Sequence, residues 1–152
     1  MRQGTRQLQF GSGTNQLEGW ENYDMDVDIT RVPLPFPDGC AKKILIEHCL
    51  EHVSGPQSFR FLQEAFRILG PKGVLRVCVP ELTRLDTKSR IDIIVNHGHQ
   101  VVFCFETVKQ LLETAGFVDI RVTPRDPIDG HHKVIGIEKD DLETLRVEAI
   151  RP

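Results

Sequence analysis

The sequence predicts an α/β protein with an open, mostly parallel sheet, since strand patterns alternate with helical patterns along its 152 residues. The apolar run at 8–10 ends in a glycine turn at 11–13. Such turns at the carboxyl end of a strand are where open α/β sheets bind nucleotide-like cofactors. The run at 74–79 is apolar almost throughout, as in a strand covered on both faces. The length fits a single domain spanning 1–152.

A second strand is expected at 23–30, where apolar and polar residues alternate strictly. Its polar face would carry Asp24, Asp26 and Asp28, either as ligand contacts or as a solvated strand edge. Only residues 14–21 separate the first two strands, which is short for a parallel crossover. Either the first crossover is abbreviated to a single turn, or the strand assignment fails there.

The other elements follow from the same patterns. Further strands are expected at 41–47, 74–79, 117–122 and 144–150, although an early helix could also contain the first of these. Ser54 begins a helix that Gly70 ends, and Thr107 has capping-box spacing at the start of a helix that runs to Ala115. Isoleucines within 82–103 allow another helix that His97-Gly98-His99 interrupts. The segment 124–141 is loop-like.

Composition narrows the class of protein. A net charge of -3 argues against general nucleic-acid binding, which usually needs a basic patch. Four scattered cysteines without a C-x-x-C pair are expected to be reduced residues of a cytoplasmic protein. The N-terminus is polar, and no apolar stretch approaches the ~20 residues that cross a membrane. We therefore expect a soluble protein without a membrane partner.

Six short motifs occur in a meaningful order. They are Gly11-Ser12-Gly13, the run 19–24, the run 34–39, Glu47-His48-x-Leu50-Glu51-His52, the run 66–76, and Leu111-Leu112-x-x-Ala115-Gly116-Phe117. In this order they resemble the small class I, type 11-like S-adenosylmethionine-dependent methyltransferases, over roughly residues 8–122. The resemblance implies a Rossmann-like fold, with helices on both faces of the sheet and an antiparallel last strand. It also implies S-adenosyl-L-methionine as cofactor.

The resemblance further implies a cofactor site. Gly11 and Gly13 would pass beneath the methionine part, and Asp24 would accept the two ribose hydroxyls, which suits an acceptor-only carboxylate. Met25 would pack on the adenine, whose amino group Asp28 would meet. The full implied cofactor-binding set is Phe10, Gly11, Ser12, Gly13, Asp24, Met25, Asp28, Ile29 and Glu47.

Methyl transfer would depend mainly on proximity and in-line alignment of the reactants, because the sulfonium already carries the methyl group on a good leaving group. His48, beside the methyl group, is the first candidate for a base, with His97 and His99 next in a cap or lid at 82–106. Each could instead be an exposed or capping imidazole. That plainer role is expected for His52, His131 and His132. The sequence does not indicate whether the methyl acceptor is a small molecule or a macromolecule. It also leaves open whether the protein forms a homo-oligomer.

Two alternatives to an active methyltransferase stay open. Asn15 replaces a third glycine, and little helix can follow the turn, so a catalytically inactive cofactor-binding or partner-subunit protein is one alternative. The other is a zinc hydrolase, because residues 48–52 match H-x-x-E-H, with Glu106 or Glu113 as third ligand. His48 directly follows an expected strand, so we favour the methyltransferase and expect no metal.

Overall fold

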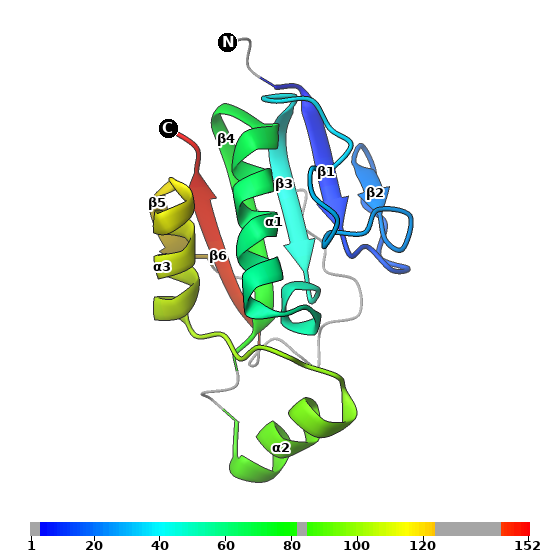
Figure 1. The fold of residues 1–152 in the computed structure, drawn as a ribbon, viewed down its shortest axis with the longest axis vertical. Helices are drawn as coiled ribbons and strands as arrows, with labels where there is room; N and C mark the ends of the chain where they lie inside the picture. The colour runs from blue at the N-terminus through cyan, green and yellow to red at the C-terminus, as the bar shows by residue number, and fades with distance from the viewer. Residues whose placement is uncertain (1–3, 82–84, 124–143) are drawn as a thin grey trace.

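The computed structural model of the protein describes residues 4–81, 85–123 and 144–152. Its strands are β1 (Arg6–Phe10), β2 (Glu21–Tyr23), β3 (Ala41–Glu47), β4 (Leu69–Pro80), β5 (Val118–Val122) and β6 (Thr144–Ile150). Its helices are α1 (Gly55–Ile68), α2 (Thr87–Asn96) and α3 (Phe105–Ala115), with a 3-10 turn η1 (Leu50–His52). The strands form one sheet in the order β2-β1-β3-β4-β6-β5 (Figure 1).

The sheet is mostly parallel, as predicted. β1 pairs in parallel with β2 and β3, and β3 in parallel with β4. The last strand, β6, inserts antiparallel between β4 and β5. Residues 11–20, between β1 and β2, contain no helix, so the first crossover is abbreviated.

The strand predicted at 23–30 is wrong, because β2 ends at Tyr23 and the chain then turns. Asp26 Oδ1 accepts the Asp24 N–H at 2.8 Å. Asp28 Oδ1 accepts both the N–H and the hydroxyl of Thr30, at 2.9 and 2.7 Å. Aspartate side chains favour turns through such local bonds, so the alternation reflects turn residues here.

The helix ends follow local signals. Ser54 begins α1 as predicted, through a capping box with Gln57. The predicted end at Gly70 is wrong, because Leu69 is already extended in β4 and α1 ends at Ile68. α3 begins two residues before the predicted Thr107, whose hydroxyl accepts the Cys104 N–H at 3.1 Å. Gly116 ends α3 in the left-handed region, with φ 105°.

α1 and α3 both pack on the same face of the sheet (Figure 1). Their apolar sides meet alternate strand residues in the main core, which includes Phe10, Ile44, Ile46, Phe61, Leu62, Leu75, Val77, Leu112 and Val147. On the opposite face, Leu45 and Cys78 are covered by Leu17 and Trp20 of the first crossover. Within the described residues this second face carries no helix, which differs from the expected helices on both faces. The cause is the helix-free crossover at 11–20.

The second face also holds a buried ion pair. Arg76 of β4 and Glu148 of β6 stand opposite each other in the ladder, with Arg76 Nη2 2.7 Å from Glu148 Oε1. Both side chains are less than a tenth exposed, and Arg121 Nη2 lies 3.6 Å from the other carboxylate oxygen. A buried charge is tolerated when it is paired in this way.

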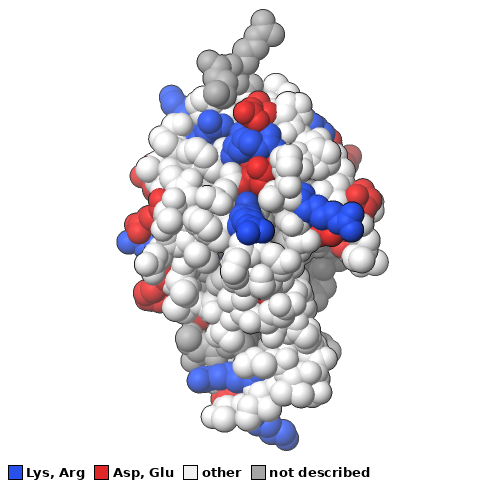
Figure 2. All heavy atoms as spheres, viewed as in Figure 1, with Lys and Arg blue, Asp and Glu red and all other residues white. Residues whose placement is uncertain are grey.

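α2 stands apart from the sheet, beyond the carboxyl ends of β1 and β3, and buries none of its residues (Figure 1). It ends at Asn96, so His97-Gly98-His99 interrupts the helix as predicted. The loop expected at 124–141 lies outside the described residues, as do His131 and His132. None of the described helices has the length and apolar character needed to cross a membrane. On the face shown in Figure 2, acidic and basic side chains alternate over the sheet and α1 without a continuous basic stripe.

Candidate active site

The strand order reverses at β1. The chain leaves β1 for β2 on one side and then returns to β3 on the other. In open α/β sheets, ligands bind outside the carboxyl ends of the strands at such a reversal. The glycine turn 11–13, Asp24 and the pair 47–48 follow the carboxyl ends of β1, β2 and β3, so the topology brings all three to one edge.

The glycine turn fits this edge in two ways. Gly11 and Gly13 have φ of 71° and 49°, in the left-handed region that favours glycine. A Cβ on Gly11 would lie 3.0 Å from both Glu47 O and Cys49 Cβ, so its lack of a side chain allows close packing on the end of β3. A Cβ on Gly13 would meet nothing within 4 Å. Gly13 therefore presents open backbone to a ligand.

Asp24 lies next to this turn. The Ser12 N–H donates to Tyr23 O at 3.0 Å and ties the turn to the residue before Asp24. Burial raises the pKa of Cys49 to about 11, with the negative charges of Glu51 and Asp24 adding to it. Gly11 packs on Cys49, so the turn lies against the residues that follow β3. Met25 beside it is 91% exposed.

The remaining cofactor residues expected from the sequence are placed differently. Phe10 and Ile29 are buried in the main core, so they can offer only backbone to a ligand. Asp28 is engaged with Thr30, whose donors lower the pKa of its carboxyl, and its Oδ2 lies 3.3 Å from Arg31 Nε. Met25 and Asp28 line a surface hollow of about 500 Å³ with Asp26, Val27, Arg31, Pro33 and Pro35.

His48 has an unusual backbone for a residue with a side chain. Its φ is 45°, and its N–H donates to Cys78 O at 2.9 Å. Its Nδ1 lies 3.5 Å from Glu51 Oε1, and its Nε2 lies 3.4 Å from the Thr144 hydroxyl. Residues held in sparsely populated backbone regions cluster at functional sites. Glu47 is buried, and this burial raises the pKa of its carboxyl. The positive charges of His48, Arg146 and Arg76 act in the opposite direction but are the smaller effect.

Comparisons with known proteins find methyltransferases of similar sequence pattern and fold. Residues 8–77 match the family model described as a methyltransferase domain. A methyltransferase structure from Archaeoglobus fulgidus, described as S-adenosylmethionine-dependent, superposes with a TM-score of 0.70 at 16% identity, covering 97% of this chain and 86% of its own. No curated protein matches the sequence.

Two further solved structures share the fold. A methyltransferase from Thermotoga maritima gives a TM-score of 0.67 at 16% identity, covering 100% of this chain and 84% of its own. Phosphoethanolamine N-methyltransferase 2 from Haemonchus contortus gives 0.64 at 12% identity, and this chain spans 50% of its length. At these identities the likeness concerns the fold, and it confirms the Rossmann-like methyltransferase fold that the motifs predicted.

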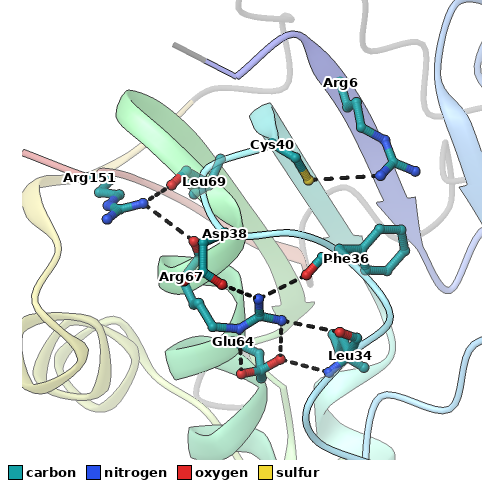
Figure 3. A network of polar contacts seen from close by, with 9 residues as sticks. All are labelled: Arg6, Leu34, Phe36, Asp38, Cys40, Glu64, Arg67, Leu69 and Arg151. Carbon is teal, nitrogen blue, oxygen red and sulfur yellow. Dashed lines mark hydrogen bonds and ion pairs between the residues drawn. The ribbon is translucent and has the colours of Figure 1, made fainter. Parts of the chain in front are cut away.

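One guanidinium of α1 fastens the segment 34–38 to that helix (Figure 3). Arg67 donates to Phe36 O at 2.8 Å and to Leu34 O at 3.1 Å, and it binds both oxygens of Glu64 at 3.0 and 2.8 Å. The same Glu64 accepts the Leu34 N–H at 2.7 Å, and Arg67 also reaches Asp38 Oδ1 at 2.6 Å. Our reading of the sequence missed this network, for which the i,i+3 spacing of Glu64 and Arg67 was the available signal.

A pocket of about 290 Å³ opens beside His48. It is lined by His48, Glu51, His52, Pro80, Ile93, His97, His99 and Thr144. The structure thus gathers the three histidines expected at this edge and adds His52, for which only an exposed or capping role was expected. Burial lowers the pKa of His99, whose ring lies 4.7 Å from that of His52.

The zinc-hydrolase geometry is not formed. His48 lies outside any helix, and η1 is a 3-10 turn, so His48 and His52 are not one turn apart on an α-helix. Neither Glu106 nor Glu113 joins the group of ligand atoms found here, which in the described part of the chain consists of Glu51, His52 and His99.

Proposed function

We propose that this protein binds S-adenosylmethionine at the carboxyl ends of β1, β2 and β3 and transfers its methyl group to an acceptor. The observation that carries the proposal is the reversal of strand order at β1, which puts the open backbone of Gly13 and the exposed carboxylate of Asp24 at one edge. The family match and the methyltransferase neighbours support it.

The residues fit this cofactor. The turn from Gly11 to Gly13 would pass beneath the methionine part, Asp24 would accept the ribose hydroxyls, and the exposed Met25 would cover the adenine. When bound, the cofactor supplies a methyl group on a sulfonium leaving group. The chain would then hold the acceptor in line with that group, which is where most of the rate enhancement would arise.

His48 would take a proton from the acceptor. Its Nδ1 faces the Glu51 carboxylate and its Nε2 faces the Thr144 hydroxyl, so the ring is held between two polar groups at the pocket. The pocket of about 290 Å³, lined in part by Ile93, His97 and His99, would admit the reacting group of the acceptor.

The chain would fold as a single domain over residues 1–152. Its four cysteines are all free thiols, as is usual for cytoplasmic proteins, and this supports a cytoplasmic location.

Isothermal calorimetry with S-adenosylmethionine tests the cofactor site. Asp24→Asn keeps the shape of the side chain and removes its charge, so we expect binding to weaken by about 10- to 100-fold. Glu18→Gln is the matched control, because Glu18 is an exposed acid of the same crossover. Unchanged affinity in Asp24→Asn, or equal losses in both variants, would refute the ribose assignment.

A binding-only protein is the second candidate, favoured by the missing helix after β1, which leaves the cofactor carboxylate without a helix N-terminus. Product formation from labelled cofactor, screened over small and macromolecular acceptors, separates the two. We expect His48→Gln to lower turnover at least about 100-fold while cofactor affinity stays within about twofold. Lys88→Gln, at an exposed position of α2, is the control. Turnover that is unaffected in His48→Gln would exclude the base.

A further inference from the structure

The structure assigns a divalent transition-metal site, of the kind that holds zinc, to Glu51, His52 and His99. One carboxylate oxygen and one ring nitrogen from each histidine lie within 4.8 Å of one another. Glu51 and His52 belong to η1, and His99 follows α2 nearly fifty residues later, so the fold creates this group. It does not depend on the proposed methyl transfer, and it departs from our expectation of no metal.

Glu51 provides the strongest reason for a cation. Its side chain is 2% exposed, and neither carboxylate oxygen accepts a hydrogen bond. The nearest ring nitrogens, His48 Nδ1 and His52 Nε2, lie 3.5 and 3.9 Å from Oε1, beyond hydrogen-bond distance. A buried carboxylate is costly unless it is paired or coordinates a metal. An ion between Glu51 and its histidines would supply the missing positive charge.

His99 offers a matching donor. Its Nδ1 is buried and has no hydrogen-bond partner, and its ring stands at 85° to that of His52. The backbone holds it there independently of any ion. Gln100 donates its N–H to Glu51 O at 2.7 Å and its side-chain amide to His52 O at 2.9 Å. The ligands are therefore brought together before a metal arrives.

The donor set selects the class of ion. Two imidazoles and one carboxylate suit zinc, whereas magnesium and calcium prefer oxygen ligands throughout. Bonds of about 2.0–2.2 Å in tetrahedral geometry would place the ligand atoms about 3.4 Å apart. In the structure these atoms lie within 4.8 Å of one another, so binding would draw them closer together. Three protein ligands would leave one position for water, and the same three residues line the pocket that His48 also lines.

The ion would also join two separate parts of the chain. Glu51 and His52 lie directly after β3, whereas His99 follows the exposed α2. Bound metal should therefore stabilise the attachment of the segment after α2 to η1, in addition to the two contacts that Gln100 makes.

Calorimetric titration of ZnCl₂ into tag-free, metal-stripped protein at pH 7 tests the site. We expect one ion per chain and a rise in melting temperature that a chelator reverses. Glu51→Gln and His99→Gln should each weaken binding at least about tenfold. His97→Gln should bind as the unchanged protein does, because His97 lines the pocket but lies outside the ligand group, with its Nε2 3.6 Å from Asp92.

Circular dichroism of each variant without metal checks that the fold is intact. If Glu51→Gln does not fold, His99→Gln still tests the site, because it changes a partly exposed side chain. The inference is overturned if the folded, unchanged protein binds no zinc at one equivalent. It is equally overturned if binding survives both Glu51→Gln and His99→Gln, or if it is lost only when His131 and His132 are replaced.

Discussion

Replacing Arg67 by methionine should unfold the protein more easily, because one guanidinium joins α1 to the segment between Leu34 and Asp38 (Figure 3). The change leaves Glu64, whose side chain is only 13% exposed, without its cation. A hydrogen bond to a charged group contributes about 1.5–3 kcal/mol, and the exposed contact to Asp38 adds at most about 1 kcal/mol.

Methionine retains part of the aliphatic packing, and losses within one network do not add. The free energy of unfolding should therefore fall by about 3 kcal/mol, which corresponds to about 6–12 °C in melting temperature for a domain of this size. Urea unfolding followed by circular dichroism measures both. Arg60→Met is the matched control, since Arg60 is an exposed arginine of the same helix, and should change stability by less than about 0.5 kcal/mol. A loss below about 1 kcal/mol for Arg67→Met would refute the reasoning.

The same network predicts a pH dependence. The hydrogen bonds from Arg67 hold the pKa of Glu64 below its usual value. A carboxyl whose pKa is lower in the folded state adds stability above its unfolded pKa of about 4.3 and loses it as the pH falls through the folded value. Melting temperatures between pH 3 and 7 should fall on the acid side in the unchanged protein and fall less steeply in Arg67→Met. Parallel curves would contradict this.

Three further outcomes test the site and the sheet. Gly11→Ala should cost about 2–3 kcal/mol by urea unfolding, since its methyl group meets Cys49 in a left-handed turn, whereas Gly13→Ala should cost about 1 kcal/mol but weaken cofactor binding by calorimetry. Equal losses of stability would contradict the distinction. Cys49, with a pKa of about 11, should react with iodoacetamide slowly at pH 7 and faster as the pH rises, as followed by mass spectrometry; rapid labelling at pH 7 would argue against its burial. Glu148→Gln should cost about 3–5 kcal/mol because it leaves Arg76 buried without its charged partner, and replacing both by leucine and methionine should cost less; a single variant as stable as the double would exclude this.

Elements with local signals were predictable. The strands at 41–47 and 144–150 have the bounds expected from their apolar runs, and Ser54 begins α1 through the capping box. These signals involve neighbours in the sequence, so the residues alone display them.

Elements without an apolar face could not be placed from the sequence. α2 buries none of its residues, so its isoleucines carried no stripe that could place it. The alternation at 23–30 wrongly predicted a strand, because aspartates that close turns have the same spacing as the polar face of a strand.

The sequence by itself determined the α/β class, the glycine turn, the start of α1 and the motifs that resemble those of methyltransferases. Only the tertiary structure decided that α1 and α3 share one face, that the ends of β1 and β2 lie at the reversal of strand order, and that His99 stands beside Glu51. The physical reason is separation along the chain. Contacts between residues far apart in sequence depend on how the whole sheet packs, and no local pattern of side chains records them.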